Sequence, residues 1–150
     1  MQADNANGPV LTAVDLSRVF GSGDTAVTAL SGISLTVQQG DFLAVTGRSG
    51  SGKTTLLNLL SGLDSPTTGT VHFHGDDLEN LRESDLVEMR RHKIGFVFQS
   101  FGLMPLLSAQ ENVELPLHIG GASWRERRQK ATEALRAVGL GTRARHRPFE

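Results

Sequence analysis

Residues 47–54 of the chain read Gly47-Arg48-Ser49-Gly50-Ser51-Gly52-Lys53-Thr54. They match the pattern G-x-x-x-x-G-K-[ST] at every fixed position, and this pattern is typical of a phosphate-binding loop. Because glycine has no Cβ, the backbone can curl tightly and turn several N–H groups towards one anion. In such a loop the lysine reaches the β- and γ-phosphates, and the threonine hydroxyl binds Mg²⁺. We call residues 47–54 the phosphate loop and expect these residues to contact the nucleotide: Gly47, Arg48, Ser49, Gly50, Ser51, Gly52, Lys53, Thr54 and Thr55.

The residues on both sides of the phosphate loop favour this interpretation. Residues 41–46 form a short apolar run that is typical of a buried parallel strand. After the loop, leucines at 56, 57, 60 and 63 have helical spacing, and Gly62 is a stop signal. The alternative is a Gly/Ser-rich linker that contains Lys-Thr by chance. Strand, loop and helix in this order make that alternative the weaker one.

Composition bounds the possible functions. The chain has 150 residues, the size of one domain, and a formal net charge of −1 with no long basic stripe. This charge argues against a protein that binds nucleic acid electrostatically. The absence of cysteine excludes disulfides and thiolate metal sites. No apolar run approaches the ~20 residues needed to cross a bilayer, so any role at a membrane would go through a partner.

The pattern predicts the remaining elements as follows. Residues 1–9 are polar, carry no secretory signal and are expected to be disordered, which leaves residues 10–150 as the folded domain. Strands are predicted at 10–20, 27–30, 33–37 and 71–74, with a turn at 21–24. His72 and His74 share one face of the last strand, and a solvent-facing pair is favoured over a metal site because no third ligand is near.

The second half of the chain is predicted to be mainly helical. An amphipathic helix is expected over 77–92, followed by a buried strand over 94–98 that ends at Gln99. A capping box at 108–111 opens another helix, which Pro116 should limit. A second box at 123–126 opens a longer helix with Gly139 as its C-cap. This last helix is expected to bury one face, made of Ala131, Ala134, Leu135 and Val138.

Together these motifs resemble those of a known family. Residues 10–148 resemble the first part of an ATP-binding-cassette (ABC) transporter ATPase, most closely those of the lipoprotein-releasing and macrolide-export type. Several stretches carry the resemblance in order and at family-like spacing: VTALSGISL from Val27, LLNLLSGLD from Leu56, IGFVFQ from Ile94, ENVELP from Glu111, VGL from Val138 and HRP from His146. One stretch would be weak evidence, whereas all of them together are strong.

The resemblance implies a fold and a set of site residues. The fold is the α/β P-loop NTPase fold with an antiparallel N-terminal β subdomain, and the cofactors are ATP and Mg²⁺. Phe20 matches the aromatic that stacks on adenine, although an ordinary apolar strand residue is the alternative. Gln99 matches the glutamine that touches Mg²⁺ or the attacking water, so Gln99 and Lys53 are the catalytic candidates, and Thr54 and Gln99 the metal candidates. Four residues match the region that receives a membrane subunit, or could equally be core: Phe101, Leu103, Met104 and Pro105.

The sequence also departs from the family pattern. The family continues after Pro148 with a Leu-Ser-Gly-Gly-Gln signature, a Walker B strand that ends Asp-Glu, and a switch histidine, and the 150 residues contain none of these. The chain is therefore expected to be an N-terminal portion that is catalytically incomplete by itself. Leu11 to Asp15 could offer a substitute acidic strand end, but it precedes the phosphate loop and lacks the second acid.

By resemblance, the function is to bind and hydrolyse ATP and so drive export or lipoprotein release through a membrane permease. Intact members pair head to tail with a second ATPase subunit and lie in the cytoplasm, on the inner face of the plasma membrane. Two alternatives remain open: a non-hydrolysing nucleotide-binding fragment or regulator, and a DNA-repair or chromosome ATPase of the same superfamily. The near-neutral charge, and the lack of a long coiled-coil insertion between Lys53 and Gln99, argue against the second.

Overall fold

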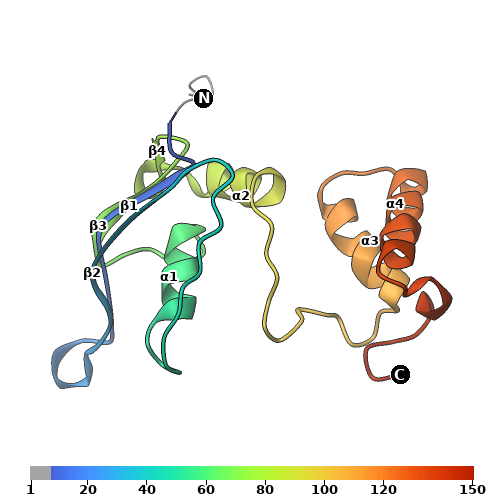
Figure 1. The fold of residues 1–150 in the computed structure, drawn as a ribbon, viewed down its shortest axis with the longest axis horizontal. Helices are drawn as coiled ribbons and strands as arrows, with labels where there is room; N and C mark the ends of the chain where they lie inside the picture. The colour runs from blue at the N-terminus through green and yellow to red at the C-terminus, as the bar shows by residue number, and fades with distance from the viewer. Residues whose placement is uncertain (1–7) are drawn as a thin grey trace. The chain divides into compact units, whose positions relative to one another are not determined.

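The structure is a computed structural model that describes residues 8–150, and the chain divides after Arg90 into two compact units (Figure 1). The expectation of disorder over residues 1–9 falls almost entirely on residues 1–7, which lie outside the described part. The strands are β1 (Leu11–Phe20), β2 (Val27–Val37), β3 (Thr68–Phe73) and β4 (Asp76–Asp77). The helices are α1 (Lys53–Leu60), α2 (Glu83–His92), α3 (Ala109–Ile119) and α4 (Trp124–Ala137), with short 3₁₀ turns at Gly23–Thr25, Leu78–Asn80 and Gly141–Arg143.

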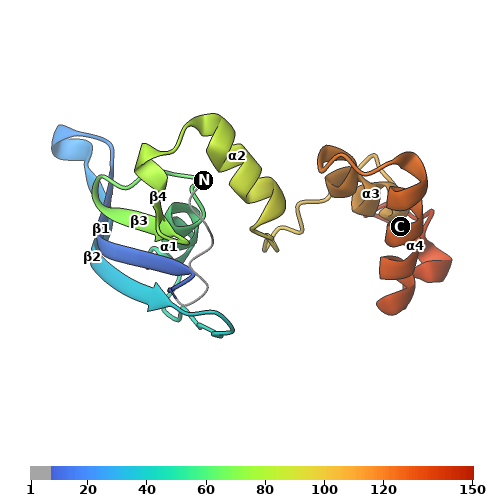
Figure 2. The same ribbon diagram turned by 90° about the horizontal axis from the view of Figure 1, so that it is seen from above.

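The first unit is built on a four-stranded antiparallel sheet in the order β2-β1-β3-β4 (Figure 2). The antiparallel N-terminal subdomain is thus confirmed, and the two strands expected at 27–30 and 33–37 are one continuous strand, β2. One side of the sheet packs on α1. This small core contains the residues that are most buried in the unit: Ala13, Leu16, Leu30, Leu56, Leu59, Leu60, Val71, Phe73, Leu78 and Met89.

Helix α1 forms where the leucine spacing predicts it, but the buried positions differ in part. Leu59 is 1% exposed, whereas Leu57 and Leu63, which the pattern assigned to the helical face, are 54% and 47% exposed. The helix ends at Leu60, two residues before the predicted stop, and Gly62 has a φ of +65°. A φ in this region is easy for glycine and costly for other residues.

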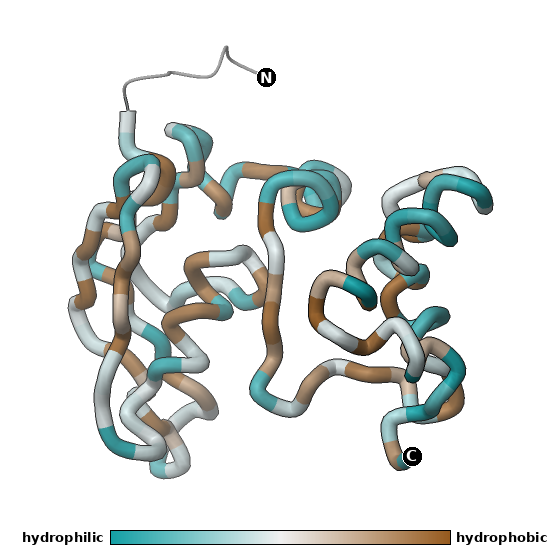
Figure 3. Tube along the Cα trace, turned by 45° about the vertical axis from the view of Figure 1, so that its right-hand side comes forward, coloured by the Kyte–Doolittle hydropathy of each residue, from teal (hydrophilic) through white to brown (hydrophobic). Residues whose placement is uncertain are grey.

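Two predicted strands are wrong. Residues 41–46 and 94–98 form neither helix nor strand, and most of their apolar side chains face solvent; Phe42 is 96% exposed and Val97 102%. Figure 3 shows the stretch after α2 as hydrophobic over much of its length. A buried parallel strand needs neighbours that satisfy its N–H and C=O groups on both sides. Within residues 8–150 no strand pairs with either segment, so the apolar pattern alone did not specify a buried strand at either place.

The helix expected over 77–92 begins later, at Glu83. Asp76 and Asp77 form the short β4, and Asp77 then caps a 3₁₀ turn, where its carboxylate accepts a hydrogen bond of 3.1 Å from the Glu79 N–H. An aspartate that can bond to its own backbone two residues on favours a turn over a helix interior. The amphipathic pattern could not separate the turn from the helix, because a buried apolar residue at position 78 fits either one. In the structure Leu78 is buried within the turn.

The second unit contains the helical pair α3 and α4. Ser108 caps α3 with a complete capping box, as predicted, but α3 continues through Pro116 to Ile119. The prediction that Pro116 limits the helix is wrong, because a proline removes only its own N–H bond and the Gly120 N–H still bonds to the Pro116 carbonyl at 2.9 Å. Gly139 follows α4 with a φ of +77°, as expected of a glycine just past a helix end.

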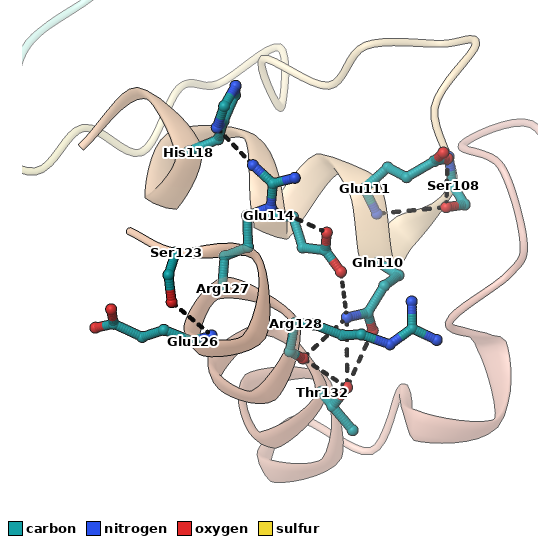
Figure 4. Close-up of polar contacts among 10 residues, drawn as sticks. All are labelled: Ser108, Gln110, Glu111, Glu114, His118, Ser123, Glu126, Arg127, Arg128 and Thr132. Carbon is teal, nitrogen blue, oxygen red and sulfur yellow. Dashed lines mark hydrogen bonds and ion pairs between the residues drawn. The ribbon is translucent and has the colours of Figure 1, made fainter. Parts of the chain in front are cut away.

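Of the predicted face of α4, only Ala131 and Leu135 are buried, whereas Ala134 is exposed and Val138 is 69% exposed. The apolar face of α4 that packs on α3 is therefore narrow, and polar contacts complete the interface between the two helices (Figure 4). The Gln110 side-chain amide donates hydrogen bonds to Glu114 at 2.8 Å, to the Arg128 carbonyl at 3.2 Å and to the Thr132 hydroxyl at 3.3 Å.

Candidate functional site

The phosphate loop leads directly into α1, and its glycines carry the backbone conformations that the motif requires. Gly50 and Gly52 have φ values of +79° and +84°, in the left-handed region that favours glycine. Gly52 is also the residue where the loop meets the sheet. A Cβ at Gly52 would collide with the Ala29 carbonyl oxygen of β2 and lie 2.9 Å from the Leu30 side chain. Strand β2 and the phosphate loop are therefore in close contact at Gly52.

Lys53 folds back over the loop that precedes it. Its Nζ donates hydrogen bonds to the carbonyl oxygens of Gly47 (3.0 Å) and Arg48 (2.8 Å) and to the Ser51 hydroxyl (3.4 Å). An ammonium group has three donors, and here all three lie against the loop. The Lys53 positive charge is thereby fixed against the backbone of the phosphate loop, where it can attract an anion and stabilise the loop.

The start of α1 adds donors at the same place. The Leu56 N–H gives the first helical hydrogen bond, to the Gly52 carbonyl at 2.8 Å. The N–H groups of Lys53, Thr54 and Thr55 precede this bond, and such groups at a helix start are available to an anion. Thr54 is exposed in the first turn, so its hydroxyl could hold a Mg²⁺ ion, which prefers oxygen ligands.

Phe20 lies at the end of β1, opposite Val27 at the start of β2. It is 43% exposed, and the Arg18 guanidinium lies over its ring, 4.7 Å from the ring centroid. Arg18 pairs in register with Leu30, the residue that approaches Gly52. In Figure 1 the tip of the β1–β2 hairpin and the phosphate loop both lie at the lower end of the first unit. Phe20 thus has an accessible ring near the end of the unit that carries the loop.

Gln99 belongs to the second unit and lies in a turn that follows the exposed stretch 94–98. The phosphate loop and Phe20 both belong to the first unit, whereas Gln99 belongs to the second. The residues matched to a membrane-subunit contact are exposed: Phe101 is 81%, Leu103 50% and Met104 51% exposed. The sequence left open whether this group is core, and in the second unit it is not buried.

Sequence reasoning missed Arg18 and Asp64. The Arg18 Nη2 lies 2.7 Å from Asp64 Oδ1, across 46 positions of the chain. The spacing of Arg18 and Phe20 could have indicated their contact, since residues two apart on a strand share one face. Nothing local to residue 64 indicates its partner.

No helix among residues 8–150 is long and apolar enough to span a bilayer.

The family model described as "ABC transporter" matches residues 30–149. The macrolide export ATP-binding/permease protein MacB of Hyphomonas neptunium is 46% identical over 140 residues, which cover 93% of this chain and 22% of that protein. The lipoprotein-releasing system ATP-binding protein LolD of Geobacter metallireducens is 45% identical over 141 residues, which cover 94% of this chain and 63% of that protein.

A solved structure is similar over the same range. The ATP-binding cassette MJ0796, seen as a dimer in a post-hydrolysis state bound to ADP and Pi, has a TM-score of 0.84 and 39% identity, and the match covers 93% of this chain and 62% of that one. The chain thus spans about a fifth of the length of the MacB relative and about three-fifths of the other two. On the family model and these relatives, the chain belongs to the ABC transporter family.

Proposed function

We propose that this chain binds ATP through residues 47–55 and serves as the nucleotide-binding part of an ABC transporter. The observation that carries the proposal is the phosphate loop, which packs on β2 at Gly52 and closes around the Lys53 ammonium at the start of α1. Lys53 attracts the β- and γ-phosphates, and the unpaired N–H groups at the helix start bind their oxygens. Phe20 supplies a partly exposed ring for the adenine.

Mg²⁺ belongs to this proposal as a cofactor that Thr54 and Gln99 would hold. When bound with ATP, the ion neutralises negative charge on the β- and γ-phosphates. The Thr54 hydroxyl is exposed beside the phosphate loop, which fits this role. Gln99 would contact the ion or orient water, and its support is the family match and its place at the end of an apolar stretch.

The transport role rests on the relatives. One is named for macrolide export and one for lipoprotein release, and the solved cassette is a dimer. We infer that this chain works with a second ATPase subunit and with a membrane permease on the cytoplasmic side of the membrane. The exposed apolar residues after Gln99, among them Phe101, Leu103 and Met104, are the proposed contact with the permease.

The proposal is tested by titrating the 150-residue protein with Mg²⁺–ATP and with AMP. A charge-assisted hydrogen bond contributes about 1.5–3 kcal/mol, so Lys53→Ala should weaken ATP binding at least about tenfold and leave AMP binding almost unchanged. Lys130→Ala, which removes an exposed lysine paired with Glu126 on α4, is the matched control and should leave ATP binding unchanged. Equal losses for ATP and AMP in the Lys53 variant would contradict the proposal.

Hydrolysis is measured in the same samples. These 150 residues carry no Walker B acid and no signature, so we expect turnover near background even where ATP binds. Because a non-hydrolysing regulator would also show no turnover alone, a mixing experiment separates the two functions. A non-hydrolysing regulator would bind ATP but gain no turnover when the protein is mixed with a full-length relative, whereas a transporter subunit would contribute its phosphate loop to a mixed dimer. Steady turnover by the 150 residues alone, abolished by Lys53→Ala, would show that a catalytic acid has been overlooked.

A further inference from the structure

The side chains around Phe20 form a chain of contacts that runs from the far end of α1 to the ring. Asp64 follows the C-terminal end of α1, and its Oδ1 accepts hydrogen bonds from Arg18 Nη2 at 2.7 Å and from the Ser65 N–H at 2.9 Å. Arg18 in turn places its guanidinium over the Phe20 ring, 4.7 Å from the centroid. This distance lies within the range of about 6 Å at which a cation is attracted to an aromatic face.

The burial of these groups shows that the arrangement is more than a surface ion pair. The side chains of Arg18 and Asp64 are 23% and 27% exposed, and the Arg18 Nε is buried without a hydrogen-bond partner. The guanidinium is therefore confined between Asp64 and the Phe20 ring, although its Nε–H makes no hydrogen bond there. Phe20 itself remains 43% exposed. One side of the ring is thus covered by the cation while a large part of the residue is open to solvent.

The backbone supports the same arrangement. The β1–β2 register shifts on both sides of Arg18, and at each shift the extra residue lies on β2, so β1 itself continues without an inserted residue from Arg18 to Phe20. The Val19 N–H donates to the Thr67 hydroxyl at 3.0 Å, which ties this segment of β1 to the residue just before β3. Because Arg18 and Phe20 are two residues apart on one strand, their side chains share a face of the sheet. Each contact reduces the freedom of the Phe20 ring.

We propose that Arg18, anchored by Asp64, is a positioning residue that covers one face of Phe20 and presents the other face to the nucleobase. The inference rests on the proposed role of Phe20 and goes beyond it by assigning a cation–aromatic–base stack. The same helix, α1, then holds both ends of the nucleotide. Its N-terminus contacts the phosphates, and Asp64 beyond its C-terminus holds the side chain that orients the base-stacking ring.

The test compares ATP with Mg²⁺–tripolyphosphate, which offers phosphates but no base. Arg18→Ala should weaken ATP binding by about twofold to fivefold, the range expected from an exposed cation–aromatic contact, and should leave tripolyphosphate binding unchanged. The second variant, Arg18→Met, keeps a long stem that can pack, so it guards against a loss caused by poor folding. It should show the same selective loss with a thermal midpoint near that of the unmutated protein.

A double-mutant cycle with Phe20→Ala separates positioning from a structural role. If Arg18 acts through the ring, Arg18→Ala should weaken ATP binding no further once Phe20 has been removed. The matched control is Arg128→Ala, since Arg128 lies over the Trp124 ring at 5.5 Å on α4, and it should not alter binding of either ligand.

Three results would overturn the inference. One is an equal loss for ATP and tripolyphosphate, another is an undiminished effect of Arg18→Ala in the Phe20→Ala background, and the third is an Arg18→Met variant that binds ATP like the unmutated protein. Failure of the proposed function looks different, because Lys53→Ala would then leave tripolyphosphate binding unchanged. If Phe20→Ala does not weaken ATP binding, the stack is excluded while the phosphate loop stands.

Discussion

Gly69 in β3 lies beside an irregular part of β1, and its missing side chain decides whether the two strands can approach. Its φ is +89°, and a Cβ there would collide with the carbonyl oxygens of Val14 and Asp15. Gly75 has nearly the same φ, +88°, but a Cβ there would meet nothing within 4 Å. The two glycines therefore share the conformational constraint and differ only in the space around them.

This pair yields a prediction at the residue scale. Gly69→Ala and Gly75→Ala should both destabilise the protein by about 1–2 kcal/mol through left-handed strain, and Gly69→Ala should lose on the order of 1–3 kcal/mol more through the collision. Urea unfolding monitored by circular dichroism measures the difference. Equal stabilities of the two variants would mean that β1 moves away from position 69 without cost.

What the sequence can predict at this scale depends on whether the cause is local. The phosphate loop is recognisable because its glycines, lysine and threonine are fixed by neighbours within eight positions. The motif predicts a glycine at position 52, but the sequence does not show the second reason for it. That reason is the Ala29 carbonyl of β2, with which a Cβ at Gly52 would collide. The ion pair of Arg18 with Asp64 is not visible at all, since the two residues meet only when β1 and α1 pack together.

At the scale of elements, α3 and α4 carry two similar N-terminal caps that should respond differently to pH. The Ser108 hydroxyl donates to Glu111 at 2.6 Å and its N–H donates to the same carboxylate at 2.8 Å. These two hydrogen bonds, the hydroxyl's being the larger effect, lower the pKa of Glu111 from its ordinary value of 4.5. In α4 the pKa of Glu126 is also lowered, but first by Lys130, and the bond to Ser123 is the smallest cause.

The sign of the pH effect follows from these directions. A carboxylate with a lowered pKa in the folded chain stabilises the fold above its ordinary pKa, and this contribution is lost as the pH falls through the lowered value. Ser108→Ala should therefore destabilise the protein at pH 7, and its cost should shrink at pH values well below 4.5. Ser123→Ala, the matched control, should have a cost that changes less with pH. Thermal unfolding of both variants from pH 7 to pH 3 checks this, and parallel curves would contradict it.

Element boundaries were predictable where a cap or a turn residue marks them. Ser108, Ser123 and Gly139 identify the ends of α3 and α4 because they act through bonds within a few residues. Of the antiparallel sheet, β1 and most of β2 and β3 could be predicted from alternation, whereas the two-residue β4 could not. The parallel strands expected at 41–46 and 94–98 could not be decided locally, because a strand exists only beside a partner and the apolar pattern does not say where that partner is.

At the scale of the whole molecule, these two exposed apolar segments predict how the 150-residue protein behaves in solution. Their side chains face solvent, as Phe42 and Val97 show, and their backbone groups have no partner strand within the described residues. Phe96 and Phe98 stack on one another at 5.7 Å between ring centroids, as alternate residues of an extended chain can. Extended apolar segments with free N–H and C=O groups are templates for pairing with another chain.

We therefore expect the protein to associate as its concentration rises, by pairing of these segments between copies. Val97→Lys should reduce the association because it places a charge in the middle of one segment, and it should leave the thermal midpoint unchanged because Val97 makes no buried contact. Ile119→Lys is the matched control: Ile119 is 57% exposed, but it lies in α3, whose backbone is already paired, so association should persist. Sedimentation velocity over a range of concentrations distinguishes the variants. A monomer at all concentrations would contradict the expected association, and equal effects of the two lysines would show that general surface hydrophobicity rather than unpaired backbone governs it.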